Sequence, residues 1–424
     1  MAVFLNLYTV HSPEVERDLD RGNMMDSIHE TVIDQANILS VEDDHTSGAY
    51  PKRPAAIVRG EGVHLWDAEG RRYLDLTSGQ GVALLGHTHP ELVKAVQEQA
   101  ARLITCPEIF YNDLRQAFYE DLAEKLPGNL SRFFLCNSGA EAIEGAIKIA
   151  RLFTERTQVI STRGGFHGRT LGALSATWNP RYRKGFDPLL PDIQHVPFND
   201  LEAMQSAISE KTAAVLLEVI QGENGVIPCS TEYMQNLRRL CDQHGVLLIL
   251  DEVQTGLGRT GRWFACLQHE VTPNILCLGK GIAGGLPMGV VVWDRSLGTL
   301  PSGSHGSTFG GNPLVCAAAR ATLRILEEEQ LPQAAASNGE TLLEELRGFH
   351  HPLLREVRGA GLMIGLELRQ RVTPVLKKLM SQGILALPAG PTVLRLLPPL
   401  IIARKDLEFA TEEIIRTIEE MEND

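Results

Sequence analysis

The strongest constraint on the fold is a pair of short apolar runs separated by a glycine-rich segment. Residues 246–250 are continuously apolar and end in Asp251 and Glu252, and the largely apolar run 274–278 leads to Lys280 in a glycine-rich loop. Such runs are typical of strands buried on both faces of a parallel sheet. Open α/β sheets bind ligands at the carboxyl ends of their strands, so we expect a site there.

Further strand and helix patterns alternate along the chain, which indicates βαβ units and a mainly parallel sheet. We expect strands at 133–136, 159–163 and 213–219, and a long helix from 314 to about 329. A β-meander precedes them, and from about residue 330 the pattern becomes α+β and ends in an amphipathic helix. The predicted organisation is an arm, in part disordered, followed by a small domain in two pieces around a large one: 1–45, 46–85, 86–329 and 330–424.

Composition excludes several classes of protein. The 424 residues carry a formal net charge of −13, which argues against a nucleic-acid surface, and contain no apolar run long enough to cross a membrane. The seven scattered cysteines include no C-x-x-C pair and suit a reducing compartment. We therefore expect a cytoplasmic enzyme without a disulfide framework.

Asp251 and Lys280 together indicate pyridoxal phosphate chemistry. A lysine amine forms a Schiff base with the cofactor aldehyde, and a carboxylate that pairs with the pyridinium nitrogen makes the ring an electron sink. Taken singly, each residue has a simpler interpretation that we would favour, as a solvated lysine or a turn-forming aspartate. The pairing of the two at neighbouring strand ends carries the hypothesis.

A glycine pattern in the same region suggests a different cofactor. Gly256, Gly258 and Gly261 match G-x-G-x-x-G, the dinucleotide fingerprint, which normally follows a strand directly and opens a helix. Here five residues intervene after the strand, and no acidic residue follows at the expected distance of about 20 positions. A nicotinamide-dependent dehydrogenase remains only a remote alternative.

Two further segments have both a functional and a plain structural interpretation. Ser138 and Glu141 form the pattern of a capping box, and a helix that begins beside Gly139 can bind a phosphate through free backbone N–H groups. An ordinary capped helix is the commoner outcome of this pattern. In the loop 164–170, Phe166 can stack on an aromatic ring and Arg169 can bind a carboxylate, unless the loop is simply a glycine-rich surface turn.

The segment Gly-His-Thr-His-Pro at 86–90 suggests a metal site at first sight. No third ligand lies nearby, and Pro90 begins a helical pattern, a position that proline commonly takes. We therefore expect a turn and a helix start, and no metal site.

In combination, these motifs resemble the class III aminotransferases of PLP fold type I, in particular their acetylornithine group. The resemblance spans about residues 50–402 and rests on the following motifs in this order: LWDAEGRRYLDL, GHTHP, NSGAEA, GGFHGRTLGALS, LLEVIQGENG, LILDEVQTGLGRTG, LGKGIAGGLPMG, GSTFGGNPL, EVRGAGLMIGLEL and VLRLLPPL. It implies a large domain with a mainly parallel seven-stranded sheet, a small α+β domain and bound pyridoxal 5′-phosphate. It also implies a homodimer with active sites at the subunit interface.

The resemblance assigns roles around the cofactor. Lys280 would form the Schiff base and shuttle the proton, and Asp251 would bind the pyridinium nitrogen. Val253 and Phe166 would contact the two faces of the ring, and Gln254 would reach the ring hydroxyl. Ser138, Gly139 and Ala140 would bind the phosphate. Thr308 would reach the phosphate of the neighbouring subunit.

It also assigns the substrate-binding residues. Arg395 would bind the α-carboxylate, Glu223 would screen Arg395 while the amino donor is bound, and Arg169 would bind the carboxylate at the other end. Tyr50 aligns with an aromatic residue on the substrate side. Gln80 stands where relatives carry an apolar or tyrosine side chain, and this difference leaves the identity of the donor open.

The implied reaction moves the terminal amino group of N-acetylornithine to 2-oxoglutarate and yields N-acetylglutamate 5-semialdehyde and glutamate, as in arginine synthesis. The main alternative is a lysine-pathway enzyme whose donor amine is attached to a small acidic carrier protein, and the segment AGPTVLRLLPPL resembles those enzymes. The net charge of −13 weighs against an acidic carrier. Ornithine and 4-aminobutyrate are further candidate donors.

Overall fold

The computed structural model describes residues 34–421, which divide into two compact units. The first unit comprises residues 34–57 and 67–69, and the second comprises 58–66 and 70–421. The first contains α1 (Gln35–His45), whose N-cap Asp34 accepts a hydrogen bond from the Ala36 N–H. Part of the predicted arm is therefore a helix, whereas residues 1–33 lie outside the described residues.

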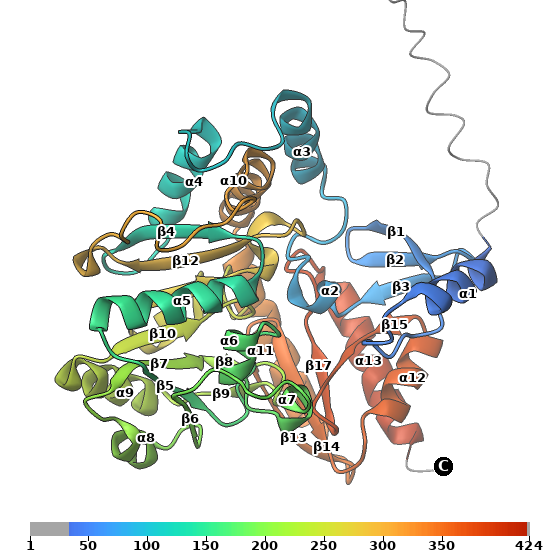
Figure 1. Ribbon diagram of the computed structural model, residues 1–424. Helices are drawn as coiled ribbons and strands as arrows, with labels where there is room; N and C mark the ends of the chain where they lie inside the picture. Colours follow the sequence, from blue (N-terminus) through green and yellow to red (C-terminus); the bar gives the residue numbers. More distant parts are fainter. Residues whose placement is uncertain (1–33, 422–424) are drawn as a thin grey trace, which may run out of the picture. The chain divides into compact units, whose positions relative to one another are not determined.

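A seven-stranded sheet forms the centre of the second unit and confirms the predicted α/β fold (Figure 1). Its order is β4-β12-β11-β10-β7-β5-β6, and only β12 runs antiparallel to its neighbours. In that order, the strands are Leu130–Cys136, Gly289–Asp294, Ile275–Leu278, Leu247–Asp251, Thr212–Glu218, Gln158–Thr162 and Ile193–Val196. The predicted strands lie within a few residues of these bounds, and β6 and β12 were not predicted.

The core occupies both faces of this sheet because side chains alternate along a strand. In β10, Leu247 and Ile249 pack with α5 (Gly139–Thr154) on one face, and Leu248 and Leu250 join the larger cluster on the other. Further helices complete the layers, among them α3 (Pro90–Arg102), α4 (Asp113–Ala123), α6 (Leu171–Ala176), α8 (Leu201–Ala207), α9 (Thr231–His244) and α10 (Pro313–Glu328). A strand with both faces covered has to be apolar throughout, as this one is.

The helix start predicted at Pro90 is confirmed, since α3 begins there with proline in its first turn. In the preceding turn, His87 Nε2 lies 2.8 Å from Asp75 Oδ2. Among residues 34–421, no group of three or more His, Cys, Asp or Glu side chains is arranged to hold a metal ion. The same part of the chain contains no helix with the length and apolar character that a membrane crossing requires.

The described residues also form three smaller sheets: two with four strands and one with two, β8 (Ile220–Gln221) and β9 (Ile227–Pro228). The first four-stranded sheet has the order β1-β2-β3-β15. The predicted meander is present as β1 (Ile57–Glu61), β2 (His64–Asp67) and β3 (Arg72–Asp75), and β15 (Ile384–Leu385) joins it. Because β15 pairs in parallel with β3, the C-terminal segment completes a sheet begun near residue 57.

The second small sheet has the order β13-β14-β17-β16. Its strands are Leu354–Ala360, Met363–Leu368, Val393–Leu396 and Leu387–Ala389. Gly359 and Ala360 end β13, and a hairpin turn leads from them to β14. Around this sheet lie α11 (Leu331–Gly348), α12 (Thr373–Ser381) and the predicted terminal helix α13 (Arg404–Glu420).

Candidate active site

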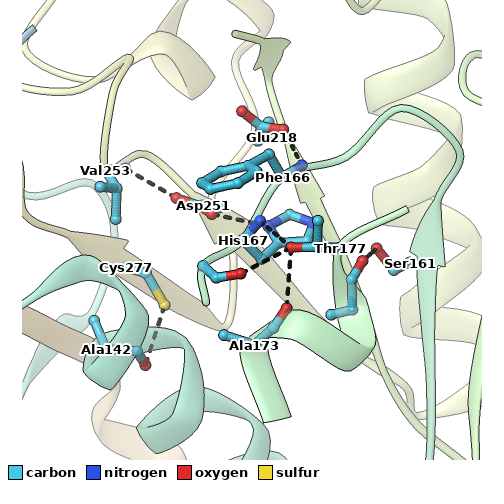
Figure 2. A network of polar contacts seen from close by, with 12 residues as sticks. Ala142, Ser161, Phe166, His167, Ala173, Thr177, Glu218, Asp251, Val253 and Cys277 are labelled. Carbon is cyan, nitrogen blue, oxygen red and sulfur yellow. Dashed lines mark hydrogen bonds and ion pairs between the residues drawn. The ribbon is translucent and has the colours of Figure 1, made fainter. Parts of the chain in front are cut away.

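Asp251 ends β10 and lies beside a buried histidine (Figure 2). Its Oδ2 is 2.8 Å from His167 Nδ1, and its Oδ1 accepts the Val253 N–H. Both side chains are buried, and His167 Nε2 has no hydrogen-bond partner among the described residues. Sequence analysis missed His167, although it stands between Phe166 and Arg169 in a motif that was singled out.

Lys280 lies at the same sheet edge as Asp251. Strands β10 and β11 are parallel neighbours in which Asp251 pairs with Cys277, and Lys280 follows two residues after β11 ends. Burial lowers the pKa of the Lys280 amine, although the carboxylates of Asp251 and Glu223 oppose this change. A lowered pKa increases the fraction of neutral amine, which is the nucleophilic form.

The N-terminus of α5 lies against the segments that carry these two residues. A Cβ atom on Gly139 would lie 2.7 Å from Val253 Cγ1, and one on Gly279 would lie 3.2 Å from Gly139 Cα. Only glycine permits so close an approach. The first-turn N–H groups and positive dipole end of α5 therefore lie beside the Lys280 loop, which is an arrangement suited to a phosphate.

The predicted capping box at this helix is only half formed. Ser138 Oγ accepts the Glu141 N–H at 3.1 Å, as expected. The Glu141 carboxylate does not return to the Ser138 N–H, but accepts hydrogen bonds from the backbone and side-chain amides of Asn137, one residue earlier. Asn137 offers two donors to one carboxylate oxygen, which accounts for the difference.

A second buried carboxylate lies next to Asp251. Glu218 ends β7, where it is the register partner of Asp251, and it accepts the N–H groups of Phe166 at 2.9 Å and Gly222 at 3.1 Å. Burial, together with the Asp251 charge, raises the pKa of Glu218 to about 7. Sequence analysis did not single out Glu218, because nothing but its place at the end of an apolar run distinguishes it.

Arg395 and Glu223, predicted as a pair, form an ion pair with 2.7 Å between Nη1 and Oε1. The Arg395 side chain is 3% exposed, whereas that of Glu223 is 31% exposed and has access to solvent. Gln254 Oε1 also lies 3.3 Å from Arg395 Nη1, and Arg395 Nε is buried without a partner in the described part of the chain. A buried arginine with unsatisfied donors is suited to bind a carboxylate.

The remaining predicted residues are more exposed. Arg169 stacks on Tyr182, and Thr308 lies in the exposed loop before α10. Gln80 belongs to α2 (Ser78–Gly81), a turn in which Gly81 adjoins the Lys280 side chain. Tyr50 belongs to the first unit and is exposed.

The glycines of the dinucleotide pattern lie in turns between β10 and β11. Gly258 and Gly261 both have a φ of +90°, and no helix begins at either of them. The geometry of a dinucleotide fingerprint is therefore missing from this segment, and the nicotinamide alternative is wrong.

Comparisons with known proteins agree with this geometry. Residues 16–418 match the family described as aminotransferase class-III. The chain is 45% identical to the acetylornithine aminotransferase of Methanopyrus kandleri, over 88% of this chain and 96% of the relative. It is 44% identical to the [LysW]-aminoadipate semialdehyde transaminase of Deinococcus radiodurans, over 87% of each protein.

A solved structure gives the same picture of the fold. The ornithine aminotransferase of Toxoplasma gondii, described with PLP at its active site, matches with a TM-score of 0.89 and 33% identity. The match covers 94% of this chain and 97% of that one.

The residues present fit pyridoxal phosphate. A carboxylate that is itself fixed by His167 suits the ring nitrogen, and the glycine-lined N-terminus of α5 suits the phosphate. Lys280, with its lowered pKa, suits the aldehyde. The chain therefore belongs to the class III aminotransferases and is a transaminase that depends on pyridoxal phosphate.

Proposed function

We propose that the protein transfers the terminal amino group of N-acetylornithine to 2-oxoglutarate, forming N-acetylglutamate 5-semialdehyde and glutamate. The observation that carries this proposal is the ion pair between buried Arg395 and solvent-accessible Glu223. One arginine can then serve two substrates: Glu223 neutralises it while the end of the donor that carries no carboxylate lies beside it, and it is available to a carboxylate when Glu223 moves away.

Each half of the reaction uses the two arginines differently. In the acceptor half, Arg395 binds the α-carboxylate of 2-oxoglutarate and Arg169 binds the carboxylate at the far end. In the donor half, Glu223 covers Arg395, and Arg169 binds the only carboxylate of N-acetylornithine. Arginine–carboxylate contacts are charge-assisted and often bidentate, so they orient a flexible substrate as well as bind it.

The residues around the cofactor hold and move protons. Pyridoxal phosphate, when bound, supplies the aldehyde that carries the amino group and a ring that accepts electrons. Lys280 Nζ, whose pKa is lowered by burial, would take the proton from the carbon that bears the reacting nitrogen and pass it to the aldehyde carbon of the cofactor, and would move a proton the opposite way in the second half. Asp251 would hold the ring nitrogen in its protonated form, and His167 fixes the orientation of Asp251.

The second candidate donor is an amine attached to an acidic carrier protein. The relative from Deinococcus radiodurans is named for such a substrate and is nearly as similar as the acetylornithine enzyme, at 44% against 45% identity. Exposed Arg181 and Lys184 lie close in sequence to Tyr182, which contacts Arg169, and a cationic rim favours an acidic partner. This candidate places the enzyme in lysine synthesis instead of arginine synthesis.

The protein acts as a homodimer in the cytoplasm. An exposed apolar patch supports the dimer; its members are Leu103, Ile104, Ile109, Phe110, Tyr111 and Phe309. Arg115 connects its two segments through hydrogen bonds to the carbonyls of Phe110 and Gly311. Thr308, predicted to reach the neighbouring subunit, precedes Phe309. The seven cysteines, all unpaired, support a reducing compartment.

A half-reaction titration tests the donor. The purified holoenzyme is mixed separately with N-acetylornithine, ornithine, 4-aminobutyrate and carrier-linked lysine, and loss of the visible absorption of the bound cofactor is followed. Rapid loss with N-acetylornithine alone supports the proposal. Faster loss with carrier-linked lysine replaces it with the second candidate, and faster loss with ornithine or 4-aminobutyrate refutes both.

A further inference from the structure

We propose that Tyr182 determines substrate specificity by fixing Arg169 in position for the distal carboxylate of a substrate. Tyr182 itself need not touch the reacting atoms, so it is a positioning residue. The inference rests on the proposed function in one respect, namely that Arg169 binds a carboxylate. It extends that function by naming the group that makes Arg169 effective.

Tyr182 contacts two residues of the loop 164–170, Phe166 and Arg169. The Arg169 guanidinium carbon lies 3.8 Å from the centroid of the Tyr182 ring, well within the distance of a cation–π contact. Tyr182 also makes an edge-to-face contact with the Phe166 ring, with 5.5 Å between the ring centroids and an interplanar angle of 81°. Arg169 is only 5.7 Å from the Phe166 ring, so the three side chains form one cluster.

Arg169 needs such support more than Arg395 does. Arg395 is buried and paired with Glu223, whereas Arg169 is exposed, and no acidic side chain within residues 34–421 pairs with it. A free arginine side chain loses rotamer entropy when a ligand immobilises it, and this loss weakens binding. The Tyr182 ring restricts Arg169 before the substrate arrives and leaves its N–H donors free for a carboxylate.

The position of Tyr182 is itself well defined. It lies in α7 (Pro180–Arg183), where Asn179 caps the first turn through a hydrogen bond from the Arg181 N–H. The preceding residue, Trp178, donates its N–H to the Gly165 carbonyl at 2.8 Å. The segment that supports Tyr182 is thus bonded to the same loop that carries Phe166 and Arg169, so the cluster keeps its geometry.

The consequence is a preference for substrates that carry a carboxylate far from the reacting carbon. N-acetylornithine, 2-oxoglutarate and glutarate have this group, whereas N-acetylputrescine is the same amine as N-acetylornithine without it. Loss of the Tyr182 ring should weaken binding of the molecules that carry the distal carboxylate and leave binding of N-acetylputrescine unchanged. A purely structural role of Tyr182, acting through Phe166, would affect both kinds.

The test compares Tyr182→Leu, Tyr182→Met and Tyr182→Phe in the holoenzyme. Phe186→Leu is the matched control, because it removes an exposed aromatic ring from the same segment. We expect glutarate, measured by calorimetry, to bind the Leu and Met variants about tenfold more weakly than the wild type. The Phe variant keeps the ring face and should bind normally, as should the control.

The second readout is the half-reaction rate with the matched pair of amines. Tyr182→Leu should lower the rate with N-acetylornithine about tenfold and leave that with N-acetylputrescine unchanged. In an Arg169→Gln background, Tyr182→Leu should have no further effect. Three results would each overturn the proposal. They are an equal loss of rate with both amines, an unchanged affinity for glutarate, and an undiminished effect of Tyr182→Leu in the Arg169→Gln background. Because glutarate reports on Arg169 whatever the donor is, a wrong donor assignment would leave this result intact.

Discussion

The ionisable side chains at the ends of β7, β10 and β11 influence one another because little water reaches them. Burial shifts them in opposite directions, lowering the pKa of Lys280 and raising that of Glu218. Both shifts favour the uncharged form, as desolvation requires. Asp251 has a directional partner in His167, which fixes the orientation of its carboxylate.

The first prediction concerns Lys280. Lys280→Ala should reduce transamination at least about a thousandfold, because the proton-transferring amine is lost. Stopped-flow measurement of both half-reactions checks this expectation. Lys377→Ala, which changes an exposed lysine of α12, is the control and should be fully active. Normal turnover in Lys280→Ala would refute the assignment.

The second prediction concerns the dependence of stability on pH. The pKa of Glu218 in the folded protein, about 7, lies above the unfolded value of 4.5, so the folded chain binds more protons between these limits. This contribution to stability is complete below pH 4.5 and is lost as pH rises through 7. In Glu218→Gln the group no longer titrates. We therefore compare the free energies of unfolding of the two proteins. The value for the wild type minus the value for Glu218→Gln should fall by up to about 3 kcal/mol as the pH rises from 5 to 8.

Denaturant titrations at several pH values measure this difference. Glu210→Gln, at a residue before β7 that is exposed, is the control and should show a flat difference. A flat difference for Glu218→Gln as well would show that Glu218 is ionised throughout and would remove the basis of the prediction.

At the level of secondary structure elements, the site depends on where α5 begins. The helix starts beside Val253 only because residue 139 has no side chain, and its N-terminal dipole then faces the Lys280 loop. The rest of α5 is fixed by the packing of Ile143, Ile147 and Ala150 on the central sheet. A small change at the first turn therefore alters the site without unfolding the helix.

The third prediction follows from this packing. Gly139→Ala would place Cβ 2.7 Å from Val253 Cγ1, so either the helix start or Val253 has to move. We expect pyridoxal phosphate to bind about ten- to a hundredfold more weakly, since the phosphate loses well-placed N–H donors. Fluorescence titration of the apoenzyme measures the affinity. Gly348→Ala, at a helix position with open space around it, should bind the cofactor normally.

At the level of the whole molecule, the apolar patch defined above is the feature that the single chain leaves unexplained. Ile109 is 83% exposed and Tyr111 is fully exposed, which is unusual for residues of this type. The patch lies beside Thr308, an exposed residue that sequence analysis assigned to the site of a second subunit. The homodimer proposed above would account for both observations.

The fourth prediction tests this explanation. The double variant Phe110→Glu with Tyr111→Glu should sediment as a monomer at micromolar concentration, because two charges cannot be buried in an apolar interface without partners. The transamination rate should fall at least tenfold, because Thr308 of the neighbouring subunit is lost from the site. This factor corresponds to an increase of about 1.4 kcal/mol or more in the activation free energy. Phe409→Glu alters another exposed aromatic residue, on α13, and should remain dimeric. A fully active monomer would contradict the role of Thr308.

The sequence by itself determined the strand ends that carry Asp251 and Lys280, the start of α5 and the family. These are local properties: an apolar run marks a strand with two covered faces, and a polar residue after it marks the edge of a sheet. The sequence could not place β15 beside β3, about 310 residues away, because pairing depends on the path of the whole chain. Likewise, β13 lacks a clear alternation in burial, so no period revealed it.

Only the tertiary structure decided which side chains support the predicted site. His167, Glu218 and Tyr182 look ordinary in sequence, and they become relevant because folding removes water around them and brings partners within 4 Å. The carboxylates of Glu218 and Asp251 lie side by side because β7 and β10 are neighbours in the sheet. Residue chemistry is written in the sequence, but pKa values, ion pairs and ring contacts depend on distance and burial, which exist only once the chain has folded.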